Sequence, residues 1–272
     1  VGPCVALNRG GVESGERQGP GGAAGGGGGR GGREGGAGGG RPREGAASRF
    51  DVLVLDAFSS DAIPLHLVTR EALARGADVT VSYVVDAEAK ALEEVLGEND
   101  RLTLVRADVG DEEAVRRVIG AMPSMDALIH IVGGFTMGPT HEIELDAWRR
   151  HVDLNLTTPF LCCKHALGRM REGGYGRIVT VGSRAVVEPM AQAAAYSASK
   201  AAVVALTRVI AAETKGTDIT ANCVLPSIID TPANRAAMGQ PKGWVSPSSL
   251  AGVICFLASA AAADIRGAAL PV

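Results

Sequence analysis

The chain has 272 residues, of which 46% are hydrophobic, so it is long enough for one large domain or two small ones with a substantial core. Its formal net charge of −3 gives no basis for a surface that binds nucleic acid or a membrane. No run approaches the ~18 apolar residues that span a bilayer. Because the amino terminus also lacks the pattern of a secretory signal, we predict a cytoplasmic protein. The five cysteines form no Cys-x-x-Cys pair, so neither a metal site nor a disulfide is predicted.

Glycine and arginine dominate residues 1–48, where large apolar side chains are almost absent. Such a segment cannot bury enough surface to offset the entropy of ordering it, so we predict a disordered tail. A Gly-x-Gly-x-x-Gly pattern can be found there, but neither a strand nor a helix flanks it. An RNA-binding tail is a weaker hypothesis, because Glu34 and Glu44 dilute the positive charge.

Ordered structure is predicted from residue 49 onward, with strands and helices in alternation. This alternation favours an α/β domain with a parallel, doubly wound sheet. The segment 226–243 contains several prolines and is predicted to be a loop. Strands are predicted over 51–56, 79–85, 102–107, 126–132, 177–181, 220–225 and 267–272, and helices over 67–75 and 87–96 and from 111, 145, 196 and 246.

The helix predicted from residue 196 is apolar on every face over residues 201–206. A helix of this kind is buried on all sides. In a sheet protein of this size, that burial indicates a second subunit as well as the sheet.

Three polar residues in this half of the chain suggest acid/base chemistry. Tyr196 and Lys200 are four residues apart and therefore lie on the same face of a helix. A nearby ammonium favours the phenolate and lowers the pKa of the tyrosine toward working pH. Ser183 follows a predicted strand, and open α/β sheets bind their ligands at the carboxyl ends of their strands.

These residues, together with Asn155 in Asp-Leu-Asn-Leu, resemble the catalytic set of the short-chain dehydrogenase/reductase family. The resemblance covers about residues 72–272. It implies a single domain of Rossmann type that is a homodimer or homotetramer, and an NAD(P)-dependent oxidoreductase that interconverts a small-molecule alcohol and a carbonyl by hydride transfer. Tyr196 would be the general acid/base, Ser183 would orient the substrate oxygen, Lys200 would lower the tyrosine pKa and hold the ribose, and Asn155 would hold a relay water. Family members usually continue past the last residue here, so the domain is predicted to be truncated at its carboxyl end.

The resemblance also implies residues that bind the cofactor, and some of them depart from the family pattern. The Asn-Asn-Ala-Gly of the family is replaced by residues 130–133, so His130 is predicted to be a wall or core residue. At the end of the second strand, Tyr83 and Val84 are neither acidic nor basic, which leaves the choice between NAD and NADP open. The implied cofactor residues are Asp108, Val109, Gly133, Tyr196, Lys200, Ile229 and Thr231, and possible substrate-pocket residues are Phe135, Met190, Met238 and Trp244.

The largest departure is in the glycine-rich turn after the first strand. Counting back from Gly76, the three glycine positions of the family are occupied by Ser59, Ile63 and Leu65. Their Cβ atoms would obstruct the approach of a pyrophosphate. Residues 51–72 are instead similar to a stretch of spermidine-synthase-like aminopropyltransferases. The alternative hypothesis is therefore a catalytically impaired fusion or scaffold protein that has lost dinucleotide binding.

Overall fold

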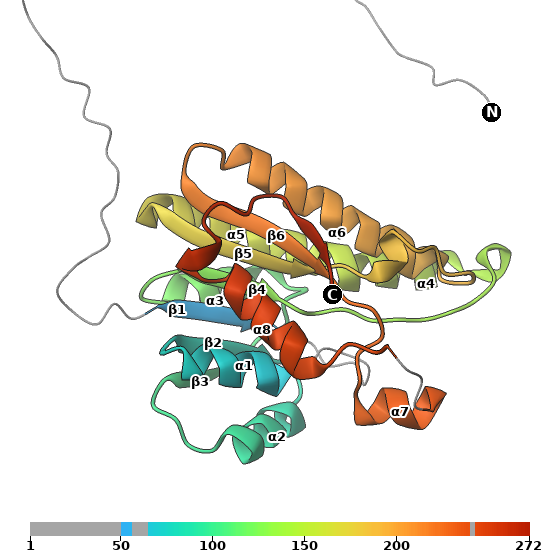
Figure 1. Ribbon diagram of the computed structural model, residues 1–272, viewed down its shortest axis with the longest axis horizontal. Helices are drawn as coiled ribbons and strands as arrows, with labels where there is room; N and C mark the ends of the chain where they lie inside the picture. The colour runs from blue at the N-terminus through green and yellow to red at the C-terminus, as the bar shows by residue number, and fades with distance from the viewer. Residues whose placement is uncertain (1–49, 56–64, 240–242) are drawn as a thin grey trace, which may run out of the picture. The chain divides into compact units, whose positions relative to one another are not determined.

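The computed structural model describes residues 50–55, 65–239 and 243–272 (Figure 1). The tail predicted over residues 1–48 therefore lies outside the described residues. The described strands form one parallel sheet in the order β3-β2-β1-β4-β5-β6-β7, and the direction of winding reverses between β1 and β4. This is the predicted doubly wound sheet of Rossmann type. The strands are β1 (Asp51–Leu55), β2 (Asp78–Tyr83), β3 (Leu102–Arg106), β4 (Ala127–His130), β5 (Tyr175–Val181), β6 (Asp218–Leu225) and β7 (Ala269–Pro271).

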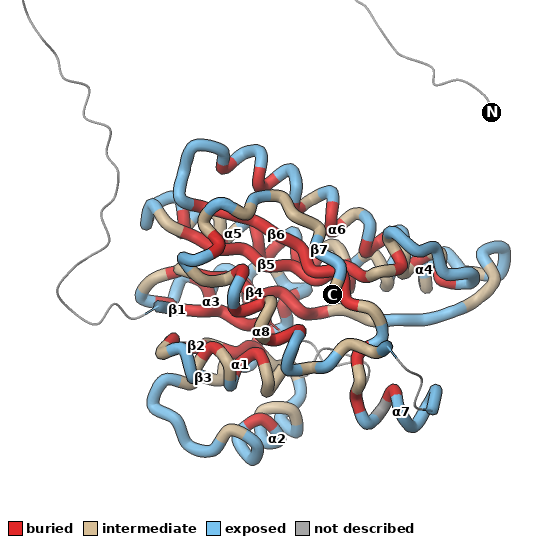
Figure 2. The backbone as a smooth tube through the Cα atoms, in the orientation of Figure 1, coloured by how far each residue is buried: buried red, intermediate tan, exposed pale blue. Residues whose placement is uncertain are grey.

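Helices cover both faces of the sheet. Residues of α1, α2 and α8 pack into one apolar core, and residues of α3, α5 and α6 pack into the core on the opposite face. The central strands are buried between these two layers (Figure 2). The helices are α1 (Leu65–Ala74), α2 (Asp86–Leu96), α3 (Glu112–Ala121), α4 (Leu145–Val152), α5 (Thr158–Gly173), α6 (Ala194–Glu213), α7 (Pro232–Met238) and α8 (Pro247–Leu257).

The helix predicted to run on from residue 145 is interrupted. A π-helical turn over Asp153–Thr157 separates α4 from α5. Such turns insert an extra residue into the helix and often occur at functional sites. Here the turn carries Asn155, whose side chain is fully buried.

One local prediction about the carboxyl-terminal part was wrong, and another was right in position. The predicted loop contains α7, which forms because Thr231 caps it, accepting a hydrogen bond from the backbone N–H of Asn234 at 3.2 Å, and because Pro232 suits its first turn. Ser246 occupies the capping position of α8, but its side chain makes no capping bond and instead pairs with Ser248 at 3.1 Å.

Arg177 is a buried charge in the middle of β5, and the sequence pattern did not indicate its role. Its side chain is 1% exposed, donates to the carbonyl oxygens of Gly176, Asp218 and Ser259, and lies 4.3 Å from the ring centroid of Tyr175. It therefore joins β5 to β6 and to the turn after α8.

No helix in the described ranges is long and apolar enough to cross a membrane.

The all-round burial predicted for α6 is not present in the single chain. Val203, Val204 and Ile210 face the interior, whereas Ala205 and Val209 are exposed on the outer side. Figure 2 shows the same division along α6. Burial of the outer side would therefore need another chain.

Candidate active site

The predicted catalytic residues come together at the carboxyl ends of β4 and β5. Ser183 lies two residues after β5 and begins a short 3-10 turn, where its Oγ accepts a hydrogen bond from the N–H of Ala185 at 3.2 Å. Tyr196 lies in the first turn of α6, and its hydroxyl is close enough to the Ser183 side chain for that serine to lower its pKa. The strand end and the helix start thus bring together two residues that are thirteen positions apart.

Lys200 lies one helical turn after Tyr196 and points into the protein. It is 5% exposed, and its Nζ donates to the carbonyl oxygen of Val181 at 3.0 Å. Burial lowers the pKa of this lysine to about 8, because the ammonium loses solvation. A side chain at Gly133 would meet this group, since a Cβ there would lie 2.8 Å from Nζ.

Asn155 holds the segment that follows β4. Its Oδ1 accepts a hydrogen bond from the N–H of Gly134 at 2.9 Å, and its Nδ2 donates to the carbonyl oxygen of the same residue at 3.1 Å. A Cβ at Gly133 would lie 2.7 Å from Oδ1. The close approach of Asn155 and Lys200 to the end of β4 therefore depends on glycine at position 133.

The expected lowering of the tyrosine pKa is not found. Burial raises the pKa of Tyr196, and only Ser183 acts in the opposite direction. The physical reason is that loss of water around the phenol penalises the phenolate. The ring of Tyr196 also makes an edge-to-face contact with Phe135, with the centroids 4.9 Å apart.

The residues predicted to bind a cofactor follow the carboxyl ends of three strands. Asp108 and Val109 follow β3, Gly133 follows β4, and Ile229 and Thr231 follow β6. Asp108 is exposed and accepts a hydrogen bond from Gly110 N–H at 2.8 Å, whereas Val109 and Ile229 are buried. Together with Tyr196 and Lys200, these positions flank the point where the winding reverses, where open α/β sheets bind their ligands. These positions therefore lie along one edge of the sheet.

The glycine-turn positions are only partly described. Ser59 and Ile63 lie outside the described residues, whereas Leu65 is the first residue of α1 and packs against the core. The side chain at the third glycine position of the family, Leu65, therefore helps to pack α1 against the core.

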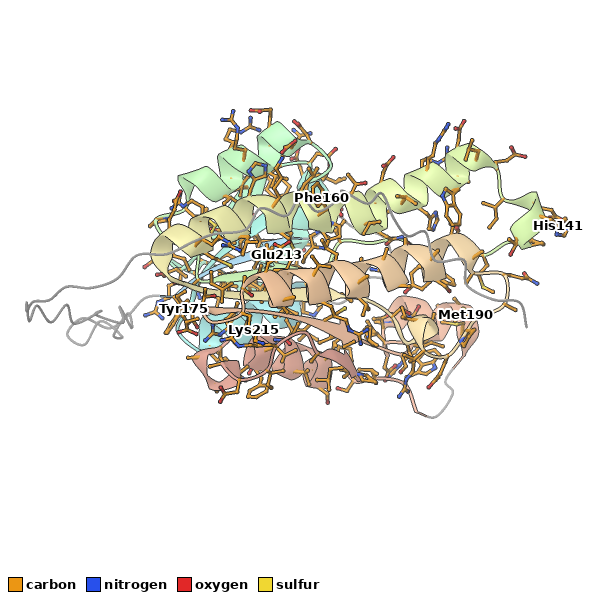
Figure 3. The ribbon with its side chains drawn as sticks, turned by 90° about the horizontal axis from the view of Figure 1, so that it is seen from above. His141, Phe160, Tyr175, Met190, Glu213 and Lys215 are labelled. Atoms are coloured by element: carbon orange, nitrogen blue, oxygen red, sulfur yellow. The ribbon has the colours of Figure 1, made fainter. Side chains whose placement is uncertain are left out.

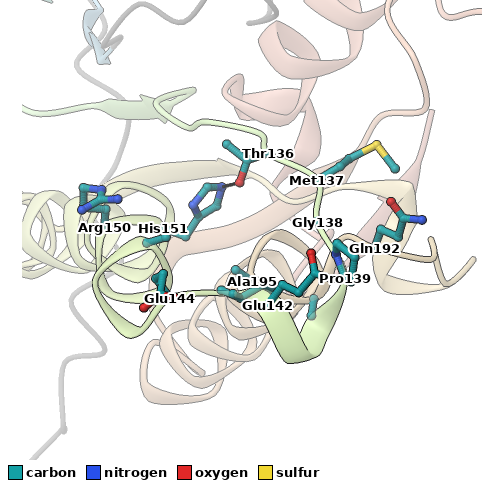
Figure 4. Close-up of a pocket in the computed structure, with 13 residues that line it drawn as sticks. Thr136, Met137, Gly138, Pro139, Glu142, Glu144, Arg150, His151, Gln192 and Ala195 are labelled. Atoms are coloured by element: carbon teal, nitrogen blue, oxygen red, sulfur yellow. Dashed lines mark hydrogen bonds between the residues drawn. The ribbon is translucent and has the colours of Figure 1, made fainter.

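A cavity of about 320 Å³ opens next to the site and was not predicted from the sequence (Figure 4). Residues after β4, residues of α4 and the segment before Tyr196 line it. Thr136 Oγ1 and His151 Nε2 are hydrogen-bonded at 3.1 Å, and Gly138 N–H donates to the Gln192 carbonyl at 2.7 Å. Gln192 has a φ of 64°, which is uncommon for a residue with a side chain. No short sequence motif would have indicated these long-range contacts.

The predicted pocket residues have different positions. Phe135 contacts Tyr196, while Met190 is exposed near the start of α6. Figure 3 shows Met190 toward the same end of the molecule as His141, with Tyr175 and Lys215 at the opposite end. Met238 and Trp244 do not line the described cavity.

Comparison with known proteins identifies the family. A model described as short chain dehydrogenase matches residues 66–241. The chain belongs to the short-chain dehydrogenase family. Members of this family are oxidoreductases that use NAD(P), and this chain shares their fold.

Two relatives and one solved structure illustrate the similarity. Cis-4-hydroxycyclohexanecarboxylate dehydrogenase of Sinomonas cyclohexanicum is 36% identical over 73% of this chain and 86% of its own. The NAD(+)-dependent 2-dehydro-3-deoxy-L-rhamnonate dehydrogenase of a Sphingomonas species is 32% identical over 71% of this chain and 87% of its own. A structure of ElxO with NADP bound shares the fold, with a TM-score of 0.75 and 20% identity over 83% of this chain and 97% of its own. The similarity predicted to aminopropyltransferases gains no support from these matches.

Proposed function

We propose that the protein is an NAD(P)-dependent oxidoreductase that interconverts an alcohol and a carbonyl, with Tyr196 as the general acid/base. The observation that supports this most is the placement of Ser183 and Tyr196 next to each other at the carboxyl edge of the sheet, with Lys200 buried one turn further along α6. A phenol held in this way can exchange a proton with a substrate oxygen.

Each residue has a separate role in the proposed reaction. Tyr196 Oη gives a proton to the carbonyl oxygen during reduction and removes it from the alcohol during oxidation. Ser183 Oγ hydrogen-bonds the same oxygen and stabilises the charge that develops on it. Asn155 fixes the backbone after β4 through its two bonds to Gly134 and has acceptor capacity left for a relay water. Phe135 packs against the tyrosine ring and limits its movement.

The cofactor residues extend along the same edge. A bound nicotinamide would supply or accept the hydride. Lys200 would hold the ribose hydroxyls, Gly133 would allow close approach at the end of β4, and Asp108 and Val109 would contact the adenine. Ile229 and Thr231 would contact the nicotinamide side. Relatives include a protein named for NAD(+) and a structure with NADP, so either dinucleotide agrees with the family.

The proposal is tested with two tyrosine variants. Tyr196→Phe is expected to reduce kcat by about 10²- to 10⁴-fold, which is the usual contribution of a general acid or base, while NAD(P)H affinity changes little. Tyr175→Phe is the matched control, because Tyr175 has a half-buried ring at the opposite edge of the sheet and its hydroxyl has no partner among the described residues. Turnover by Tyr196→Phe at the wild-type rate would refute the assignment.

A second candidate function is a scaffold protein that no longer binds a dinucleotide. Leu65 favours it, because a packed leucine occupies a position where the family has glycine. Fluorescence titration with NADH and with NADPH separates the two functions. Absence of binding at millimolar dinucleotide would favour the scaffold and contradict the enzyme.

We also infer that the protein forms a homodimer or homotetramer. Leu145 and Trp148 on α4 and Phe160 on α5 are exposed, and none of the residues of α4 is buried. Light scattering coupled to size exclusion gives the mass in solution, and Phe160→Glu is expected to lower it. A cytoplasmic location stays a prediction.

A further inference from the structure

A row of buried polar side chains crosses three strands beneath the proposed site. His130 on β4 pairs in register with Thr180 on β5, which in turn pairs with Cys223 on β6. Residues opposite each other on paired strands point to the same face of a sheet. Helix α6 covers this face, because the hydroxyl of Thr180 lies 2.7 Å from the hydroxyl of Thr207. The row thus lies between the sheet and the helix that carries Lys200.

The ammonium of Lys200 lies close to this row. Its Nζ is 3.0 Å from the carbonyl oxygen of Val181, the residue after Thr180, and is also close to Gly133. The charge of the ammonium acts to lower the pKa of His130 and of Cys223. Both side chains are therefore near enough to Lys200 to interact with its charge. The contact with Val181 uses one of the three N–H donors of the ammonium.

His130 is a buried acceptor whose partner is not among the described protein atoms. The side chain is 2% exposed, and its Nε2 has no hydrogen bond with any described residue. An interaction of the imidazole with the backbone of its own residue acts to raise the pKa of His130. In a neutral ring one nitrogen donates and the other accepts; we assign the proton to Nδ1, the nitrogen nearer the backbone, so that Nε2 carries the lone pair. Buried polar atoms of this kind are normally satisfied by an ordered water.

We propose that His130 is a positioning residue for Lys200, and that its Nε2 holds an ordered water that also accepts a hydrogen bond from Lys200 Nζ. The imidazole stays neutral at working pH, because burial and the lysine charge lower its pKa to about 3. The other titratable groups around Lys200 are Cys223, whose thiol pKa is raised by burial, and Tyr196. Both are neutral at pH 7, so the water and His130 form the polar environment of the ammonium on this side.

Under the proposed function, a restraint on Lys200 also affects activity. Lys200 would hold the ribose, so an anchor that restrains Nζ would align the cofactor as well. The water site and its effect on the lysine charge do not depend on catalysis. They can therefore be tested even in a protein without turnover.

The test measures the pKa of Lys200 by NMR with ¹³C- and ¹⁵N-labelled lysine. The chain has five lysines, so the spectrum is simple, and Lys200→Met assigns the signal. His130→Leu removes the acceptor and is expected to lower the Lys200 pKa by roughly one unit, because the hydrogen bond favours the charged form. His130→Asn restores an acceptor, and the pKa should return toward the wild-type value.

The matched control is Thr220→Val. Thr220 on β6 is also fully buried and its hydroxyl also has no partner among the described residues, but it lies further from the carboxyl edge. Its replacement should leave the Lys200 pKa unchanged. If His130→Asn shifts the pKa as much as His130→Leu, or if neither shifts it, the proposal is overturned. A high-resolution crystal structure provides the second test, since it must show a water within hydrogen-bond distance of both nitrogens. If the wild-type protein shows no turnover, the proposed function is contradicted. The Lys200 pKa values measured for the His130 variants would still test the proposed water site.

Discussion

Gly133→Ala tests how tightly the candidate site is packed. A Cβ at this position would lie 2.7 Å from Asn155 Oδ1 and 2.8 Å from Lys200 Nζ, which is about 0.7 and 0.6 Å inside the 3.4 Å at which ordinary contact begins. Neither group can retreat freely, because Asn155 makes two hydrogen bonds to Gly134 and Lys200 makes one to Val181. The added methyl group must therefore displace at least one of the two side chains.

The expected cost follows from these contacts. Overpacking of a dense site costs about 1–3 kcal/mol. Replacing glycine by alanine also reduces the conformational freedom of the unfolded chain, which stabilises the folded state by about 0.4–1 kcal/mol. The variant should therefore be less stable by about 1 kcal/mol, within a range of about 0–2.6 kcal/mol, in urea denaturation. If the proposed function is correct, kcat/KM should also fall by on the order of 10²-fold, because the misplaced groups are those that position the reaction.

Gly168→Ala is the control for this prediction. Gly168 lies within α5, and no atom lies within 4 Å of a Cβ built there. Alanine should stabilise the helix by up to about 1 kcal/mol at this position. If Gly133→Ala were as stable and as active as Gly168→Ala, the close packing around Gly133 would be disproved.

Three further predictions concern stability. Arg177→Met should cost about 3 kcal/mol in urea denaturation, because one buried and two partly buried carbonyl oxygens lose their donor. Asp218→Asn, at a half-exposed partner, should cost less than about 1 kcal/mol. Equal losses would contradict this account. His130 has a folded pKa of about 3 against ~6.5 when unfolded, so stability should be full above pH 6.5 and should fall by about 2 kcal/mol between pH 7 and pH 5, a loss that His130→Asn should lack. The hydrogen bonds of Lys164 and His165 lower the pKa of Glu112, so their contribution should be present above the unfolded pKa and lost as the pH falls through the folded value. Acid titration of Glu112→Gln, followed by circular dichroism, should lack this component, and a curve identical to wild type would exclude it.

The elements themselves were largely predictable from local pattern. Runs such as Val52–Leu55 are buried strands because they are short, apolar and made of valine and leucine, and the alternation with helices indicated a parallel sheet. Within the predicted helix, the four-residue spacing of Tyr196 and Lys200 is enough to place both on one face, and Ser183 follows a strand as expected. These properties depend on neighbours within a few residues, which is why sequence alone reveals them.

Local pattern failed where a residue's partner is distant in the chain. The π turn at Asn155 and the cavity beside α4 depend on contacts with segments that are remote in sequence. The pKa of Tyr196 was predicted with the wrong sign, because spacing shows which charge is near but not how much water is excluded.

The sequence by itself determined the α/β architecture, the family and the set of polar residues at the carboxyl edge. Only the tertiary structure decided how those residues are held. It buries Lys200 against Val181, fixes Asn155 to Gly134, and places His130 under the same helix with a lone pair that needs a partner. The physical reason is that hydrogen bonding and desolvation depend on distances in space, and strand register brings together residues that are far apart along the chain.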